Sequence, residues 1–474
     1  MKHVIGIVAF LLFARFLSAA EPIDVGSRRQ LFVDGYLIKR IDAVRQVLHQ
    51  PVRRDAAIKP EHPWEQNGVS YMVAFKDGDR FRAWYRADNS TIESDSVPLT
   101  AYAESVDGIH WTKPSLGIVE FNGSKENNLV WAGEAINLAP FRDDNPNCDP
   151  QERYKAIART ADLCALVSPD GLHWKLIDEN PISTDRPFDS HNIGFWDDVT
   201  QQYVAYTRGI RSDGKIGRGM EDDFMGGVRW IRRTTSKDFR NWTPLEPIDT
   251  GDAPSEEFYT NSTMRYERAP DYLLMFPSRF ASAREPKPGW KFGKGVDDIA
   301  FLSSRDGVHF DRTFMEAFIR PGLDEGNWHE RSLYMERAIL QTSPNELSLY
   351  CMQNWRLPSV NISRYTLRPD GFVSIEGPYE GGELVTKPLI FEGKELRLNF
   401  ATSAVGAVRV EIQTIDGSPI DGFALTDMPE IYGDKLDHPV SWTGGSDLSA
   451  LAGKPIRLRF VLHDANLYAF RFQP

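Results

Sequence analysis

Short stretches of alternating apolar and polar residues, separated by glycine, proline and aspartate, run through residues 69–375. An alternation of period two is typical of half-buried β-strands, and the apolar spacing of three to four residues that marks helices is nearly absent. We therefore expect an all-β fold. The predicted strands are 69–75, 81–85, 100–104, 137–141, 153–158, 163–167, 192–196, 202–207, 227–234, 262–266, 272–276, 298–303, 332–336, 346–352 and 360–365.

One hairpin pattern recurs along these strands. It consists of a serine, an Asp-Gly pair and an aromatic residue that opens the next strand, as in Ser105-Val-Asp-Gly-Ile-His-Trp111. Asp-Gly favours the positive φ angles of a tight turn, so these hairpins and their histidines are expected to be structural. The copies, the third and fifth of which are degenerate, are centred on Asp107, Asp170, Asp238, Asp306 and Asp370, at steps of 63, 68, 68 and 64 residues.

A steady period of this length, with four strands in each repeat, predicts β-propeller blades joined by some long loops. The sequence thus predicts a five-bladed β-propeller over residues 28–375. Five further strands, at 383–388, 395–401, 408–414, 456–462 and 467–472, predict a small C-terminal β-sandwich over residues 376–474. That domain could bind polysaccharide, but a structural cap is the favoured interpretation because no exposed aromatic platform is evident.

The first 20 residues have the pattern of a signal peptide. A short polar start precedes an apolar run, and Ser18-Ala-Ala20 supplies small residues for cleavage before Glu21. Export to a secreted or periplasmic location is therefore predicted, with no membrane span after removal of the signal, because this run is too short and broken to span well and no other approaches transmembrane length.

Composition narrows the function further. Hydrophobic residues make up 41% and aromatic residues 12%, so the chain is globular. The net charge of −12 would become −14 without residues 1–20, which makes nucleic acid an improbable partner. The three cysteines, Cys148, Cys164 and Cys351, match no zinc motif and allow at most one disulfide, with buried thiols favoured. No metal or cofactor is predicted, and calcium in the channel has no sequence signature.

The segments before the first strand of each repeat are the candidate site. In a propeller these strands line a central channel and run in the same direction, so the residues that precede them converge at one mouth. The candidate catalytic residues there are Glu65, Asp189, Glu257 and Glu330. The candidate substrate-binding residues are Trp64, Asn137, His191, Asn192, Tyr259, Asn261, Trp328, His329 and Arg331.

This residue set suits glycoside hydrolysis. The reaction needs one carboxylic acid to protonate the leaving oxygen and one carboxylate as base or nucleophile, and crowded carboxylates raise one another's pKa. Aromatic faces stack on sugar rings, and polar side chains bind hydroxyls. The alternative for any single acid is a turn-forming or solvated loop residue. Asp143, Asp144, Asp197 and Asp198, after the first strands of repeats two and three, are interpreted as turn residues.

The repeat region resembles the five-bladed glycosidase superfamily, which includes glycoside hydrolase families 32, 43, 117 and 130, and looks most like family-32-like exported bacterial proteins. The similarity rests on the five repeats and on hairpins such as Val167-Ser-Pro-Asp-Gly-Leu-His-Trp174. It implies a first-blade Asp as base or nucleophile and a later Glu as acid, to which Glu65, Asp189 and Glu257 correspond in position. The chain lacks Asn-Asp-Pro-Asn-Gly in the first repeat and Arg-Asp-Pro before the second, so fructan specificity is not implied.

Three other functions remain open at this point. A non-catalytic carbohydrate-binding propeller would use the same mouth without paired carboxylates. A sialidase has similar Ser-Asp-Gly-Trp hairpins but six blades and an arginine triad, which is not evident here. A phosphorylase would need basic residues to hold phosphate, for which Arg331 is the one obvious candidate.

Overall fold

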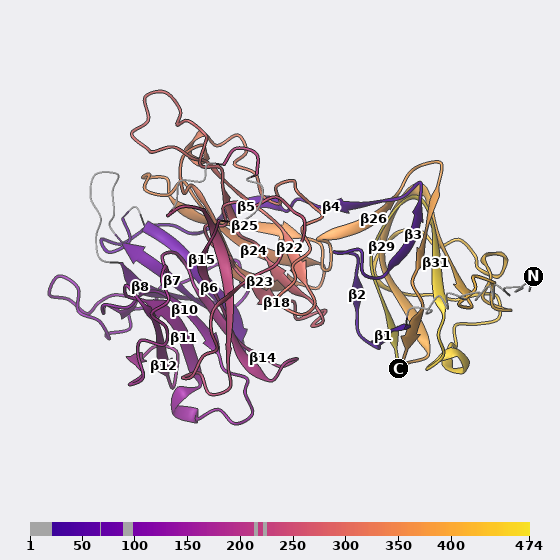
Figure 1. Ribbon diagram of the computed structural model, residues 1–474, viewed down its shortest axis with the longest axis horizontal. Helices are drawn as coiled ribbons and strands as arrows, with labels where there is room; N and C mark the ends of the chain where they lie inside the picture. Colours follow the sequence, from indigo (N-terminus) through magenta and orange to yellow (C-terminus); the bar gives the residue numbers. More distant parts are fainter. Residues whose placement is uncertain (1–20, 67, 89–97, 213–216, 221–224) are drawn as a thin grey trace, which may run out of the picture.

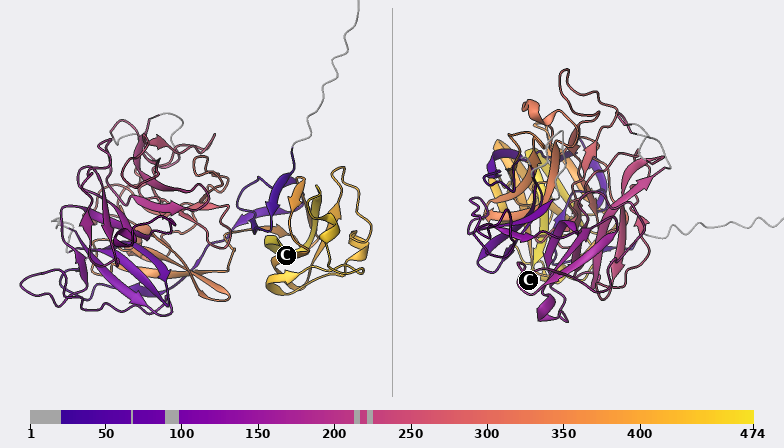
Figure 2. Two further views of the ribbon diagram at one scale, coloured as in Figure 1. Left: turned by 90° about the horizontal axis from the view of Figure 1, so that it is seen from below. Right: turned by 90° about the vertical axis from the view of Figure 1, so that its left-hand side faces the viewer.

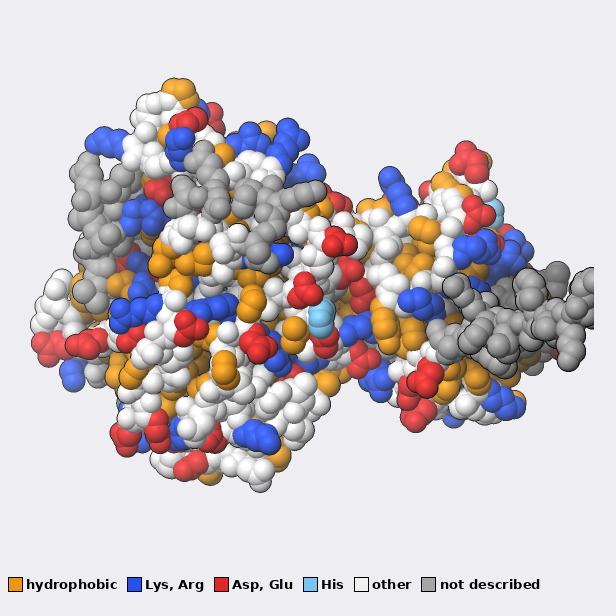
Figure 3. All heavy atoms as spheres, in the orientation of Figure 1, with side chains coloured by type: hydrophobic (Ala, Val, Ile, Leu, Met, Phe, Trp, Pro, Cys, Tyr) orange, Lys and Arg blue, Asp and Glu red, His pale blue; other side chains and the backbone are white. Residues whose placement is uncertain are grey.

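A computed structural model describes residues 21–66, 68–88, 98–212, 217–220 and 225–474; the predicted signal peptide and Asn67 lie outside these ranges. The described chain is all-β, with short 3-10 turns as its only helices. It forms a larger lobe and a smaller lobe joined by a narrow waist (Figures 1 and 2). Acidic and basic side chains are interspersed over both lobes on the face shown in Figure 3. Within the described ranges, no helix has the length and apolar character needed to cross a membrane.

The larger lobe consists of antiparallel sheets that follow the sequence repeats. The first three repeats each form four strands: β6 (Gly68–Asp77), β7 (Arg80–Asp88), β8 (Leu99–Ser105) and β9 (Leu129–Trp131); β10 (Ile136–Arg142), β11 (Tyr154–Arg159), β12 (Leu163–Ser168) and β13 (Lys175–Leu176); β14 (Ile193–Asp197), β15 (Gln202–Arg211), β16 (Val228–Ser236) and β17 (Glu246–Pro247). The fourth forms β18 (Met264–Arg265), β19 (Leu273–Met275) and β22 (Leu302–Ser304), with the pair β20 (Ser278–Phe280) and β21 (Asp297–Ile299). The predicted strand 298–303 is therefore split between β21 and β22, which belong to different sheets.

The last repeat closes onto the first. Its strands are β23 (Leu333–Ser343), β24 (Glu346–Gln353) and β25 (Asn361–Leu367). Its fourth strand is β5 (Val52–Ile58), from near the start of the chain, which pairs with β25. The inner strands β23 and β6 are bridged in parallel, at Arg337 and Val73, so the first and last repeats share one eight-stranded sheet. Apolar side chains fill the spaces between neighbouring sheets, as Phe141 and Ile157 do against Phe195.

The smaller lobe contains both ends of the described chain. Its strands are β1 (Ile23–Gly26), β2 (Gln30–Leu31), β3 (Ile38–Asp42), β4 (Arg45–Leu48), β26 (Val373–Gly377), β27 (Gly382–Thr386), β28 (Leu389–Phe391), β29 (Glu395–Gln413), β30 (Asp434–Pro439) and β31 (Arg457–Gln473). Residues 28–48, which the sequence grouped with the repeats, thus pair with C-terminal strands. Two pairs of predicted strands are single long strands, β29 and β31, because a register shift between Thr402 and Ala407 lets their pairing continue past Gly406.

The Asp-Gly hairpins are structural, as expected, and each turn is joined to the preceding repeat. Asp170 Oδ1 accepts hydrogen bonds from the amides of Leu172 and His173, both at 2.9 Å. The Gly171 carbonyl accepts the Trp84 indole N–H at 2.7 Å. Gly171 has a φ of +77°, and an added Cβ would lie 2.9 Å from Trp84. Glycine is therefore required by both backbone conformation and packing.

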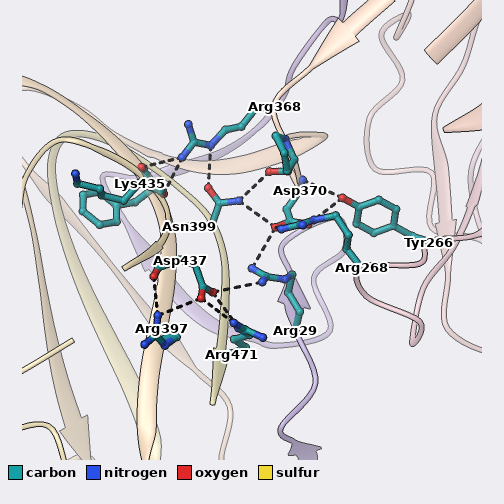
Figure 4. Close-up of polar contacts among 12 residues, drawn as sticks. Arg29, Tyr266, Arg268, Arg368, Asp370, Arg397, Asn399, Lys435, Asp437 and Arg471 are labelled. Atoms are coloured by element: carbon teal, nitrogen blue, oxygen red, sulfur yellow. Dashed lines mark hydrogen bonds and ion pairs between the residues drawn. The ribbon is translucent and has the colours of Figure 1, made fainter. Parts of the chain in front are cut away.

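The fifth hairpin joins the two lobes instead. Asp370 lies between Tyr266 and Arg268 of the larger lobe and Arg29 and Asn399 of the smaller lobe (Figure 4). The strand after this turn, expected as the fourth strand of the last repeat, is β26, which pairs with β31 and β4. The polar cluster around Asp370 therefore lies at the waist, where the chain leaves the repeats.

Candidate functional site

Three stacked tyrosines lie where the inner strands begin. Tyr334 of β23 stacks between Tyr71 of β6, with ring centroids 5.2 Å apart, and Tyr259, 5.4 Å apart. Tyr71 also stacks on His191 at 5.1 Å. The described part of the chain thus brings residues from the first, third, fourth and fifth repeats into one aromatic cluster, as the convergence argument requires. Sequence reasoning missed Tyr71 and Tyr334, although both are aromatic positions within predicted strands.

Asp189 is the most accessible of the candidate acids at this cluster. Its side chain is 52% exposed, pairs with Arg159 Nη2 at 3.2 Å, and accepts the Tyr259 hydroxyl at 3.4 Å. Desolvation raises the pKa of Asp189, but the charges of Arg208 and Arg159 outweigh it and hold the pKa below its ordinary value. At neutral pH this carboxylate is ionised and can act as base or nucleophile.

Glu257 pairs with an arginine whose charge also acts on Asp189. Arg229 of β16 donates to Glu257 Oε2, lies over the Tyr259 ring at 5.6 Å, and also lowers the pKa of Asp189. Glu257 is fully buried, and its Oε1 has no hydrogen-bond partner among the described residues. Its backbone N–H donates to the sulfur of Met220. The charge of one arginine therefore acts on two acids from different repeats, an arrangement that sequence spacing does not reveal.

Glu330 and Arg331 form a third acidic position. Arg331 Nη2 donates to Glu330 Oε1 at 3.0 Å, and the Glu330 side chain is 21% exposed. The Arg331 guanidinium lies 4.6 Å from the Trp355 ring. Burial opposes the charge of Arg331, but Tyr334, Tyr259 and Glu330 raise its pKa above the ordinary value. Arg331 therefore remains charged beside the tyrosine stack.

Glu65 is placed differently from the other candidate acids. It is fully buried, pairs with Lys113 at 2.9 Å, and accepts hydrogen bonds from the Tyr85 hydroxyl at 2.5 Å and from the amides of Glu61 and His62. Both oxygens are thereby occupied, which is the environment of an acid that fixes its own loop. We leave Glu65 out of the proposed catalytic pair for this reason.

Most of the remaining candidates are buried and hydrogen-bonded to neighbouring loops, and one is exposed. Asn137, Asn192 and Asn261 are buried, and their side-chain amides donate to backbone carbonyls. Trp64 is also buried, and its indole N–H donates to Asn128 at 2.9 Å. Trp328 is 48% exposed and bonded to Gly322.

The two candidate histidines are neutral. Burial lowers the pKa of His191 to about 3 and that of His329 to about 4. His329 stacks on Phe292 with centroids 3.7 Å apart, away from the tyrosine stack, whereas His191 is part of it. Neither Nε2 atom has a hydrogen-bond partner among the described residues. His191 is therefore the candidate histidine that belongs to the tyrosine cluster, with its Nε2 buried.

Two further buried acids were not predicted from the sequence. Glu336 of β23 accepts the Met72 amide at 2.5 Å, and Asp297 of β21 accepts the Ser332 amide at 2.9 Å. Burial raises the pKa of both well above the ordinary value, so both are expected to be protonated over a wide pH range. Both occupy strand positions where only the three-dimensional pairing reveals what they contact. In the described part of the chain, no group of three or more His, Cys, Asp and Glu side chains could hold a metal ion.

Comparisons with known proteins give similarity in structure alone. No protein-family model matches the chain, and no curated protein does. Among solved structures, a glycosyl hydrolase from Bacteroides ovatus is 15% identical, with a TM-score of 0.45, over 68% of this chain and 95% of its own. A family 43 arabinoxylan arabinofuranohydrolase from Bacillus subtilis is 13% identical, with a TM-score of 0.41, over 87% of this chain and 97% of its own.

The similar structures also include an enzyme of another class. An N-acetylgalactosamine deacetylase from F. plautii is 11% identical, with a TM-score of 0.42, over 90% of this chain and 96% of its own. Glycoside hydrolases are thus among the structures similar to this chain, as the resemblance of the repeats implied. At these identities and TM-scores the similarity assigns no activity.

Proposed function

We propose that this protein is an exported glycoside hydrolase, built on a five-bladed β-propeller with an appended β-sandwich, that cleaves a plant or algal poly- or oligosaccharide. The observation that carries the proposal is the pair Asp189 and Glu257 near Tyr259: Asp189 accepts the Tyr259 hydroxyl, and Glu257 pairs with Arg229, which lies over the same ring. Paired carboxylates beside aromatic rings are what glycosidic bond cleavage requires. The glycoside hydrolases among the similar structures agree with this proposal.

In the proposed mechanism Asp189 is the ionised carboxylate. Its lowered pKa keeps it charged, and its exposure lets it reach a water molecule or an anomeric carbon. We assign the role of proton donor to Glu257, whose Oε1 is buried and has no partner among the described residues, so substrate binding has to expose this oxygen. The Tyr259 hydroxyl lies at Asp189, and the partly exposed Arg331 is placed to bind hydroxyl groups of the sugar.

The test is turnover of a polysaccharide panel by the mature chain and its isosteric variants. Asp189→Asn and Glu257→Gln should each lower kcat by roughly 10²–10⁴-fold without loss of folding. Asp185→Asn is the matched control, because Asp185 is also exposed, at 65%, and pairs with Arg232 instead. Glu65→Gln should lower the free energy of unfolding rather than kcat. Full activity in both Asp189→Asn and Glu257→Gln would refute the assignment, and NMR of the product anomer would distinguish retention from inversion.

A non-catalytic carbohydrate-binding protein is the second candidate, favoured by the complete burial of the candidate acids Glu65 and Glu257. It predicts saturable binding of an oligosaccharide with no turnover by any preparation. In that case Tyr259→Ala should abolish binding, while Asp189→Asn should leave it within about twofold of the parent, because stacking on an aromatic face needs no acid.

A further inference from the structure

A cavity lies farther along the inner strands than the proposed catalytic residues. The tyrosine stack and Asp189 are at strand starts, whereas the cavity is lined by later residues of the same strands, among them Phe75, Phe141, Phe195 and Arg337. It has a volume of about 420 Å³, which is within the range of small-molecule sites. None of the candidate residues predicted from the sequence lines it.

Most arginines around this cavity are neutralised by an acid. Arg142 pairs with Asp144 at 2.8 Å, and Arg265 pairs with Asp197 at 2.7 Å. A third, Arg268, pairs with the buried Asp370 described above. These arginines therefore carry little net charge toward a ligand.

Arg337 is different. Its Nε donates to the Thr263 carbonyl at 3.2 Å, and its guanidinium lies 5.4 Å from the Phe195 ring. No ion pair joins it to any residue in the described ranges, and its two Nη atoms have no hydrogen bond there. Burial lowers the pKa of Arg337 to about 10, and Glu267 at the exposed rim is the acid that opposes this. Its positive charge is therefore held inside a partly apolar cavity without a counter-ion.

We propose that this cavity binds a small oxyanion-bearing ligand, a sugar carboxylate or a sulfate, through the free end of the Arg337 guanidinium. The two Nη groups can donate to two oxygens of one anion, and the fixed Nε–Thr263 bond orients that fork into the cavity. Phe75, Phe141 and Phe195 supply an apolar wall for a sugar ring, which is what distinguishes a sugar acid from an inorganic anion. The site uses none of the residues of the proposed catalytic pair.

Isothermal titration of the whole mature chain tests this site with sodium sulfate, D-galacturonate and neutral D-galactose at matched ionic strength. Galacturonate or sulfate should bind and galactose should not. Arg337→Met should raise Kd about tenfold or more, because a charge-assisted bidentate contact is lost. Arg142→Met, at the same cavity but paired with Asp144, should leave Kd within about twofold.

Two more variants keep the test decisive if Arg337→Met does not fold. Arg337→Lys keeps the charge without the fork and should weaken binding by an intermediate factor, whereas Glu267→Gln removes the nearest acid and should tighten it. Binding of galacturonate alone would identify a sugar acid, and binding of both anions would identify an oxyanion site. The proposal is overturned if neither anion binds, or if Arg337→Lys and Glu267→Gln bind as the parent does.

Discussion

Replacing Asp370 by asparagine tests whether the buried cluster at the waist holds the lobes together. The carboxylate accepts hydrogen bonds from Arg268 at 2.8 and 3.0 Å, from Tyr266 at 2.8 Å and from Asn399 at 3.1 Å, and it pairs with Arg29 at 3.1 Å. Burial raises the pKa of Asp370, but the two arginines outweigh it and lower the pKa below its ordinary value. The ionised form is therefore the one that stabilises the fold.

The expected loss of stability follows from the charged groups that the variant leaves without a partner. Asp370→Asn has nearly the same shape but leaves two arginines facing a neutral group, and the Arg29 side chain is 9% exposed. Removing one member of a buried ion pair costs roughly 3–5 kcal/mol. We expect a loss of about 3 kcal/mol, at the lower end, since the amide oxygen can still accept a hydrogen bond and Arg268 reaches solvent. Asp434→Asn, at a 70% exposed acid paired with Arg368, should cost about 0–1 kcal/mol.

Urea denaturation followed by tryptophan fluorescence measures both variants. The contribution of a carboxyl with a lowered pKa is present above its ordinary pKa of 3.8 and is lost as the pH falls through the folded value. The difference between Asp370→Asn and the parent should therefore be complete at pH 7 and shrink below about pH 4. A loss under about 1 kcal/mol at pH 7, or an equal loss in Asp434→Asn, would refute the reasoning.

Three further substitutions test local features by the same denaturation assay. Gly171→Ala should cost about 1–3 kcal/mol, because a positive φ and contact with Trp84 oppose a Cβ, whereas Gly78→Ala, also at positive φ but in open space, should cost less. As the pH rises from 5 to 8, Glu336→Gln should become more stable relative to the parent. Burial raises the pKa of Glu336 in the folded protein, so the unfolded parent ionises first and the parent's free energy of unfolding falls with rising pH; a pH-independent difference would contradict this. As the pH falls from 6.5 to 4, His191→Phe should lose less stability than the parent. The folded His191 has a pKa of about 3 and stays neutral in this range, so only the unfolded parent gains a proton, which lowers the parent's free energy of unfolding; parallel pH profiles would count against it.

Local sequence rules predicted the repeats well because their causes are local. Asp170 and Gly171 make a hairpin through bonds within a few residues, and strands such as β12 occupy the predicted positions. The same rules misassigned residues 28–48 and the strand after Asp370, since these pair with partners hundreds of residues away. Strand pairing across such distances depends on which edges remain open after the rest has folded, which no local pattern encodes.

The candidate site was predicted in position rather than in detail. Converging strand starts do bring Asp189, Tyr259 and His191 together, as sequence spacing implied. Glu65 was indistinguishable from Asp189 by sequence, because its neutralising partner Lys113 lies in another loop. Partner identity, which separates a structural acid from a reactive one, is a property of packing.

The two ends of the inner strands therefore differ in charge, with candidate acids at one end and an arginine at the other. At the strand starts an exposed, ionised Asp189 and an unpartnered oxygen of Glu257 lie beside tyrosine faces, which suits chemistry that needs a base and a proton donor. At the strand ends Arg337 has no ion pair among the described residues and lines a cavity together with phenylalanines, which suits retention of an anion. The two sites share strands but no residues, so Asp189→Asn and Glu257→Gln should leave anion binding unchanged, whereas Arg337→Met also removes a charge that lowers the pKa of His191. Intact anion binding in the two acid variants therefore separates failure of one proposal from failure of the other.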